Sequence, residues 1–229
     1  FKIFFIGLNY NFSLEKDFNL KLGEKEEFQN YSIEFKDLRL KDFKNYKAVI
    51  GEFKINNSLI GASYPTYFIA DIAANHDGSL SRAKKLIKLC AHAGANAAKF
   101  QHFKAETIVS DLGFKQMKRL SHQKKWKKSV YQIYKEASIN PKWNKVLKKT
   151  CKKYNIDFMT SSYDLNYVDE VKKYTCAYKI GSGDISWIEI IKKISKKKKP
   201  VILSTGASDI KDVERAVSAI KKINKKIII

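Results

Sequence analysis

The feature that most constrains the fold of this chain is a regular alternation of two kinds of segment. From about residue 49 onward, short apolar runs rich in β-branched and aromatic residues are followed by segments in which apolar residues recur at helical spacing. This alternation predicts parallel βαβ units joined by right-handed crossovers. The runs predicted to be strands are "TYFIADIA" (66–73), the centre of "AGANAAKFQHF" (93–103), "IDFMT" (156–160), "AYKIG" (177–181), "PVILS" (200–204) and the start of a sixth strand in "KKIII" (225–229).

Amphipathic segments that we predict to be helices lie between these runs. Gly94 stands where the first helix would end, and we expect Ser208 to cap the last helix, with Asp209 and Asp212 in its first turn. Two architectures fit the alternation, an open doubly wound sheet and a (β/α)8 barrel, and periodicity alone does not decide between them. The predicted helices cover 80–91, 143–154, 164–174, 187–195 and 210–220.

Residues 1–48 differ from the rest of the chain. They are rich in Phe, Lys, Glu and Asn, and fragments such as "YSIEFKDLRL" alternate like strands, but they contain no motif. We therefore divide the chain into an unassigned N-terminal segment, 1–48, and a barrel region, 49–229. The chain begins with Phe rather than Met, which suggests that an upstream part is absent.

The charge balance raises the possibility of a nucleic-acid partner. The formal net charge is +22, and a basic surface collects phosphates through counterion release. Only four of the 45 basic residues are Arg, however, whereas bidentate contacts to bases and phosphates favour Arg. The lysines are also spread along the chain. We therefore favour a solvated lysine-rich surface and predict no nucleic-acid partner; a basic anion-binding module is the alternative.

The cysteines and the apolar runs bear on the compartment. Cys90, Cys151 and Cys176 form no C-x-x-C pair, so we predict reduced, buried thiols in a reducing compartment. No apolar run approaches the roughly 18 residues that a membrane span requires, and the N-terminus lacks a signal-peptide cleavage pattern. We expect a cytoplasmic protein with no membrane partner.

Polar residues stand at the end of each of the first five predicted strands. In both candidate architectures the site lies at the carboxyl ends of the strands. The chain contains neither a G-x-x-x-x-G-K-[ST] nor a G-x-G-x-x-G motif, and its four histidines show no paired metal-ligand spacing. The strand-end residues are Asp71 with "ANHDGS" (74–79), Lys99 with Gln101, "TSS" (160–162), Lys179 with "GSGD" (181–184), and "STGAS" (204–208).

Two of these residues, Lys99 and Lys179, lie within apolar strands. Burying an ammonium costs several kcal/mol, on the order given for isolated charges, unless an anion compensates it. Hydroxyls and glycine-flanked amides follow on neighbouring strands. We therefore predict an anion site, for which a doubly charged phosphate monoester is the natural occupant.

Three blocks in this order resemble the N-acetylneuraminate (sialic acid) synthase family, which includes legionaminic and pseudaminic acid synthases. They are residues 68–101, "AYKIGSGDI" (177–185) and "PVILSTGAS" (200–208). The resemblance implies a TIM (β/α)8 barrel, of which this chain would contain about five and a half βα units. It also implies a transferase of sialic acid biosynthesis that condenses phosphoenolpyruvate with an N-acyl hexosamine such as N-acetylmannosamine. The products are a nine-carbon 2-keto sugar acid and phosphate.

The resemblance also implies which residues bind phosphoenolpyruvate. Two lysines would hold it, and three hydroxyls would contact it. These residues are Lys99, Lys179, Ser161, Ser182 and Ser204.

The remaining matched positions concern catalysis and the sugar. Asp71 occupies the position of a family glutamate near the sugar and the intermediate, and Gln101 would lie on the sugar side. Asp184 matches an acidic position that orients or deprotonates the attacking water. Asn75 and His76 match an Asn-His pair, to which we assign only proximity to the substrate.

The family's metal-binding histidines lie beyond the sixth strand, so we expect them beyond Ile229 and predict no metal ligand in this chain. A divalent ion, Mn²⁺ or Mg²⁺, would polarise the aldehyde in the complete enzyme. The chain is then an inactive fragment, with an unpaired sheet edge, of a homodimeric enzyme. A related phosphoenolpyruvate-dependent aldol-type synthase with a phosphorylated acceptor is the alternative within enzymes.

Overall fold

The computed structural model describes part of the chain, and that part divides into two compact units. One unit is Asn9–Gly51, and the other combines Phe1–Leu8 with Glu52–Ile229. The first contains an antiparallel pair, β2 (Lys25–Phe28) and β3 (Tyr31–Glu34). The division into 1–48 and 49–229 stays a prediction. The described residues are 5–7, 25–28, 31–34, 53–56, 58–60, 64–116 and 126–229.

The second unit contains a sheet of seven parallel strands in the order β1-β6-β7-β8-β9-β10-β11. From β6 onward, spatial order follows chain order, as expected when consecutive βαβ units are added side by side. β1 pairs with the other edge of β6, although the sequence had led us to assign no structure to that segment. The strands are β1 (Phe5–Gly7), β6 (Ile69–Ala73), β7 (Ala97–His102), β8 (Asp157–Ser162), β9 (Tyr178–Ile180), β10 (Val201–Leu203) and β11 (Ile227–Ile228).

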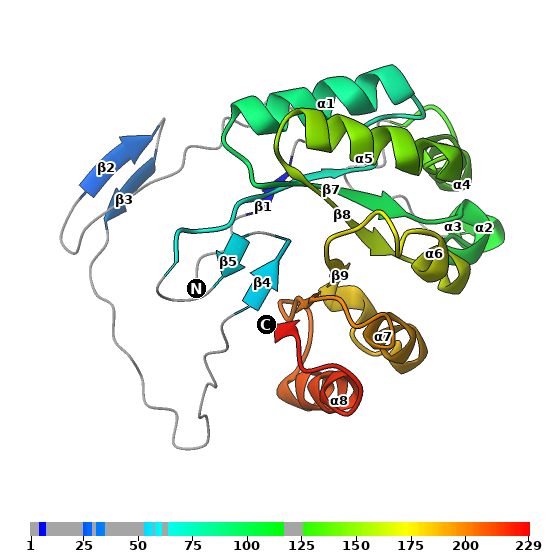
Figure 1. Cartoon of the computed structure of the whole chain (residues 1–229). Coiled ribbons are helices and arrows are strands. Elements are labelled where there is room, and N and C mark those ends of the chain that lie inside the picture. The colour runs from blue at the N-terminus through cyan, green and yellow to red at the C-terminus, as the bar shows by residue number, and fades with distance from the viewer. Residues whose placement is uncertain are drawn as a thin grey trace. The chain divides into compact units, whose positions relative to one another are not determined.

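Helices join these strands and follow one another in an arc around one side of them (Figure 1). Five βα units and a sixth strand are present, which confirms the predicted incomplete barrel. The connection from 102 to 141 contains α2–α4, which we did not predict, and residues 117–125 lie outside the described part. The helices are α1 (Leu80–His92), α2 (Ala105–Ile108), α3 (Asp111–Gln116), α4 (Val130–Ala137), η2 (Pro141–Trp143), α5 (Asn144–Lys153), α6 (Leu165–Glu170), η3 (Ser182–Asp184), α7 (Ile188–Ser195) and α8 (Ile210–Lys221).

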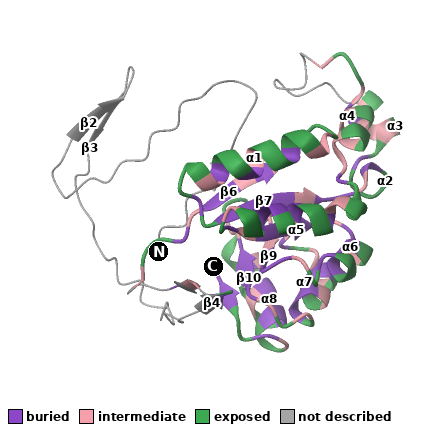
Figure 2. Ribbon diagram, turned by 45° about the horizontal axis from the view of Figure 1, so that its top comes forward, coloured by how far each residue is buried: buried purple, intermediate pink, exposed green. Residues whose placement is uncertain are grey.

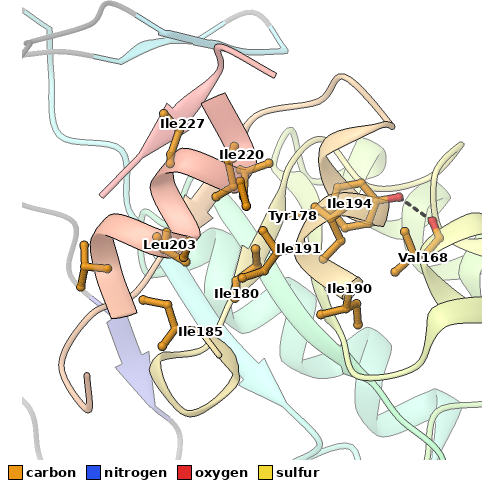
Figure 3. Packing of buried hydrophobic residues seen from close by; sticks show 14 of the residues in the cluster. Val168, Tyr178, Ile180, Ile185, Ile190, Ile191, Ile194, Leu203, Ile220 and Ile227 are labelled. Carbon is orange, nitrogen blue, oxygen red and sulfur yellow. Dashed lines mark hydrogen bonds between the residues drawn. The ribbon is translucent and has the colours of Figure 1, made fainter. Parts of the chain in front are cut away.

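Two hydrophobic clusters fill the layer between helices and sheet. In the first, Ile87 of α1 and Leu147 of α5 pack with Phe100 and Phe158 of β7 and β8. In the second, α7 and α8 cover β9–β11, and the Tyr178 hydroxyl donates to the Val168 carbonyl at 2.6 Å (Figure 3). The strands are mostly buried, whereas the helices expose their outer sides (Figure 2). The alternation of apolar residues along each strand therefore defines a helix side and an inner side.

The inner side is apolar at the amino-terminal ends of the strands. A third cluster there joins strand residues to two residues of a hairpin, Ile55 and Ile60, from β4 (Phe53–Ile55) and β5 (Ser58–Ile60). This packing fills the barrel interior below the strands' carboxyl ends, which are left for polar side chains. The cluster includes the strand residues Ile69, Ala97, Met159, Ile202 and Ile228, and Ala177, which directly precedes β9.

One predicted helix boundary is confirmed and one is wrong. Gly94 follows the end of α1 with φ +84°, the left-handed conformation typical of a glycine at C′. Ser208 does not cap α8: Asp209 is the N-cap and accepts from the Asp212 backbone N–H. The Ser208 hydroxyl instead donates to the Ser182 carbonyl at 3.0 Å, and so ties two strand-end loops together.

The cysteines and the helix lengths can be compared with the sequence-based expectations. Cys90, Cys151 and Cys176 are buried free thiols, as predicted. Burial raises the pKa of Cys90 to about 11, so this thiol is protonated at neutral pH. Among the described residues, no helix has the length and apolar character that crossing a membrane requires.

Candidate active site

Alternation along β7 and β9 directs two lysines to the inner side of the sheet. Lys99 lies between Ala98 and Phe100, which both pack in the helix-side core, so its side chain emerges on the opposite face. Tyr178 and Ile180 flank Lys179 in the same way. The predicted alternation is therefore a property of strands with one face toward the helices and one toward the barrel interior.

Lys99 forms an ion pair inside the barrel. Its Nζ lies 2.8 Å from Asp71 Oδ1, and the two side chains are 3% and 25% exposed. The two residues are register partners on adjacent strands, β6 and β7. The register shifts directly after Asp71, where Ala73 has φ +50°. This irregularity ends the pairing and turns the chain into the loop 74–79.

Lys179 interacts electrostatically with the same two residues, Asp71 and Lys99. Its pKa is lowered from 10.5 to about 8, first by burial and then by the Lys99 ammonium, while Asp71 and Asp184 oppose the shift. The two ammonium groups thus repel each other inside a partly desolvated space. A bound dianion would relieve this repulsion, so the site is electrostatically prepared for an anion.

Asp184 lies over the backbone of Gly181 at the end of β9. A Cβ on Gly181 would lie 2.7 Å from Asp184 Oδ2, closer than side-chain atoms approach one another, whereas a Cβ on Gly183 would meet nothing within 4 Å. Burial raises the pKa of the Asp184 carboxyl, and the Lys179 ammonium opposes the shift. The absent side chain at Gly181 is what lets this carboxylate occupy the site.

Tyr163 is part of this group, and we did not predict it. Gln101 Nε2 donates to the Tyr163 hydroxyl in a long hydrogen bond of 3.5 Å. Burial and then the Asp184 charge raise the pKa of Tyr163 to about 12, while a hydrogen bond with Ser161 lowers it. Ser161 is 2% exposed and is the register partner of Gln101. In the sequence, the position of this tyrosine directly after "TSS" could have indicated that it belongs to the site.

Ser182 and Ser204 lie in the loops that follow β9 and β10. Both are half-buried, and the Ser204 backbone N–H donates to the Ile180 carbonyl at 3.1 Å, which continues the β9–β10 pairing into the loop. Ser182 begins the η3 turn that carries Asp184. Their predicted contact with phosphoenolpyruvate stays a prediction.

His76 is buried on the helix side of the sheet. Its ring centroid lies 5.8 Å from that of Trp143 and 6.3 Å from that of Phe100, and its Nδ1 accepts from the Gly78 N–H at 3.2 Å. Burial lowers its pKa to about 4, so the imidazole is neutral. Asn75 lies beside it in the turn after β6. The assignment of this pair to the neighbourhood of the substrate stays a prediction.

His102 is also buried on the helix side, and both of its ring nitrogens are hydrogen-bonded. Nδ1 lies 2.7 Å from Thr160 Oγ1, and Nε2 lies 2.7 Å from Asn144 Oδ1. Burial lowers its pKa to about 4. His92 contacts the Tyr154 ring edge-on at the end of α1, and His122 lies outside the described residues. These contacts give His102 a structural role.

The described residues do not assemble a metal site. Within them, no group of three or more His, Cys, Asp or Glu side chains is arranged to hold a metal ion. The residues in this part of the chain therefore do not fit a divalent ion by themselves, and we derive no step through one.

Several curated proteins are similar to this chain over most of its length. It is 35% identical over 161 residues to an N,N'-diacetyllegionaminic acid synthase of Campylobacter jejuni, an alignment covering 69% of this chain and 47% of that protein. It is 25% identical over 166 residues to the human N-acetylneuraminate-9-phosphate synthase, covering 72% and 46%. The chain thus spans about half the length of the curated relatives it matches.

Solved structures and a family model agree with this result. A sialic acid synthetase from Leptospira borgpetersenii matches with a TM-score of 0.64 and 29% identity, covering 76% of this chain and 56% of that one. A truncated 3-deoxy-D-arabino-heptulosonate 7-phosphate synthase from Thermotoga maritima matches with a TM-score of 0.56 at 15% identity, which shows the shared fold alone. The model of the NeuB family matches residues 86–229. More than half of the chain is thereby covered, and the chain belongs to the NeuB family.

Proposed function

We propose that this chain is part of an enzyme that condenses phosphoenolpyruvate with an N-acyl hexosamine such as N-acetylmannosamine. The products are a nine-carbon 2-keto sugar acid and phosphate. The observation that carries the proposal is the pair of lysines, Lys99 and Lys179, which repel each other on the inner side of the sheet. Membership of the NeuB family and the similarity to a legionaminic acid synthase support it.

Phosphoenolpyruvate is held by the lysines in this proposal. The substrate carries a phosphate and a carboxylate, so Lys99 and Lys179 together neutralise part of its charge. Hydroxyls of Ser161, Ser182 and Ser204 donate to its oxygens. Because Asp71 already pairs with Lys99 at 2.8 Å, that ammonium is oriented before the substrate arrives.

The carbon–carbon bond forms between C3 of phosphoenolpyruvate and the aldehyde carbon of the acceptor. The aldehyde oxygen takes up a proton, and water adds to the cationic C2 and loses a proton. The resulting tetrahedral intermediate expels phosphate by cleavage of its C–O bond and leaves a ketone. Asp184, whose carboxyl pKa is raised by burial, orients the water and accepts its proton, and Asp71 and Gln101 contact the acceptor.

The acceptor in this proposal is an unphosphorylated sugar. The chain is 35% identical to the legionaminic acid synthase but 25% identical to the human 9-phosphate synthase, which favours this reading over a phosphorylated acceptor. A divalent ion, homodimerisation and a cytoplasmic location stay predictions for the complete enzyme.

Phosphate release from phosphoenolpyruvate plus N-acetylmannosamine tests the proposal. A chain extended to the length of its relatives should turn over with Mn²⁺ or Mg²⁺, and Lys99→Met should reduce turnover by about a thousandfold. Lys88→Met, on the exposed side of α1, is the control. We expect the 229-residue chain itself to be inactive.

Three results would count against this function. The first is an extended protein that releases no phosphate with any N-acyl hexosamine. The second is a Lys99→Met variant that keeps wild-type turnover. The third, a preference for 6-phosphorylated over free N-acetylmannosamine, would favour the alternative acceptor class. Robust turnover by the 229-residue chain would overturn only the expectation that it is inactive.

A further inference from the structure

The polar groups of the inner side form two tiers. The lower tier is charged and contains Asp71, Lys99 and Lys179. The upper tier contains Gln101, which lies two residues further along β7 than Lys99 and therefore about 6.6 Å nearer the carboxyl end of the strand. Ser161 is its register partner on β8, so this tier consists of neutral hydrogen-bonding groups. An anionic ligand on the lysines would leave the upper tier to a neutral partner.

Tyr163 joins the upper tier through its hydroxyl. A phenol oxygen can accept two hydrogen bonds and donate one. The Gln101 amide donates to this oxygen. Because the pKa of Tyr163 is raised to about 12, the phenol keeps its own proton at neutral pH. Because the Gln101 amide acts as the donor in this pair, it does not use the phenol proton, which can be donated to another acceptor.

The hydroxyl faces the space above Gly181. The point that a Gly181 Cβ would occupy lies 3.8 Å from the Tyr163 oxygen and 2.7 Å from Asp184 Oδ2. The phenol and the carboxylate therefore border the same small space, and the glycine keeps this space free of a side chain. An oxygen of a ligand placed there would meet a neutral donor on one side and a carboxylate on the other.

We propose that Tyr163 is a further substrate-binding residue, whose hydroxyl donates a hydrogen bond to an oxygen of the neutral acceptor sugar. The Gln101 amide, which donates to the phenol oxygen, orients the phenol, so that its proton points away from this amide. The inference rests on the proposed function, since it assumes that phosphoenolpyruvate occupies the lysines. This contact favours an acceptor that has an oxygen at this point over an acceptor that lacks one.

Steady-state kinetics of Tyr163→Phe in the extended protein test the inference, with N-acetylmannosamine as the probe. Loss of one neutral hydrogen bond predicts a rise of about five- to tenfold in the acceptor KM. The KM for phosphoenolpyruvate should stay within about twofold, because the lower tier is untouched. Tyr154→Phe, at the end of α5 against His92, is the matched control and should change neither constant.

The outcomes separate this inference from the proposed function. A wild-type protein that does not turn over refutes the proposed function, and this inference with it. A wild-type protein that turns over while Tyr163→Phe keeps its acceptor KM, or raises both KM values alike, overturns this inference alone. Tyr163→His, which retains a ring donor, should recover part of the acceptor affinity. If neither variant folds, Tyr163 has a structural role and the inference is also overturned.

Discussion

The two faces of β7 and β8 both bury polar side chains, and they do so in opposite ways. On the helix side, His102 is completely buried, but Thr160 and Asn144 meet both of its ring nitrogens at 2.7 Å. On the inner side, burial and then repulsion by the Lys99 ammonium lower the pKa of Lys179. Burial alone therefore does not distinguish a structural polar group from a functional one.

The difference lies in the charge of the buried groups: the helix-side groups are neutral, and the inner-side groups are ionised. Around His102 the helix-side network is complete, because both ring nitrogens of this residue have a partner, and such networks stabilise one packing arrangement. The inner-side group combines two ammonium ions with the carboxylates Asp71 and Asp184 and remains strained by repulsion and desolvation. Perturbed groups of this kind cluster at sites that bind or transform a ligand.

The strongest test of this contrast is Lys179→Met. We expect turnover to fall by about a thousandfold, because a charge that stabilises the anionic substrate is lost. Thermal stability should stay equal or rise, since the substitution removes a desolvated charge and its repulsion with Lys99. Phosphate release and the melting temperature measure the two effects. A variant that loses stability in proportion to activity would place Lys179 with the structural groups.

Gly181→Ala tests whether Asp184 needs the space that the absent side chain of Gly181 leaves. The new Cβ would lie 2.7 Å from Asp184 Oδ2 and would displace this carboxylate, so we expect kcat to fall by about a hundredfold. Gly183→Ala is the matched control, because its Cβ meets nothing within 4 Å and the two glycines belong to the same turn. Equal kinetics for the two variants would show that Asp184 is not held at a functional position.

Asn144→Ala tests the helix side. This substitution removes the partner of His102 Nε2 and leaves a buried polar atom unsatisfied, which destabilises the fold by about 1–3 kcal/mol. The folded fraction should keep its kcat, since the network lies on the face away from the lysines. Urea unfolding and kinetics measure the effects, with the exposed Asn166→Ala on α6 as control. A loss of kcat at unchanged stability would contradict this assignment.

The smallest effect that we expect comes from the titration of Lys179. As the pH rises, this titration changes the affinity for the substrate and the stability of the fold in opposite directions. Its pKa is about 8 in the folded protein but 10.5 ordinarily, so between these values the unfolded chain binds more protons and stability rises with pH. Affinity for phosphoenolpyruvate should fall over the same range, because the ammonium is lost. Calorimetric titration and melting temperatures across this window test both signs, and Lys179→Met should abolish both trends.

Much of the fold was predictable because each element has its own period. Apolar residues at a period of two predicted β6–β10, and residues at helical spacing predicted α1, α5, α7 and α8. The helices α2–α4 were not predicted, since they are short and lack long apolar stripes. The cap of α8 was assigned to Ser208 rather than Asp209, because two adjacent residues of similar capping propensity differ only in their tertiary partners.

The candidate site was predictable in part for the same reason. Lys99, Gln101 and Lys179 were identified because charged or amide side chains interrupt apolar strands, which burial penalises. Tyr163 was missed, because a tyrosine after a strand is ordinary in sequence and gains meaning only from its neighbours Gln101 and Asp184.

The sequence by itself determined the alternation of strands and helices and the placement of polar residues at strand ends, since both depend on local periodicity. Only the tertiary structure decided which polar residues meet. The Asp71–Lys99 pair and the repulsion between Lys99 and Lys179 both join residues from different strands. Such contacts depend on strand register and on the curvature of the sheet, which no single segment encodes.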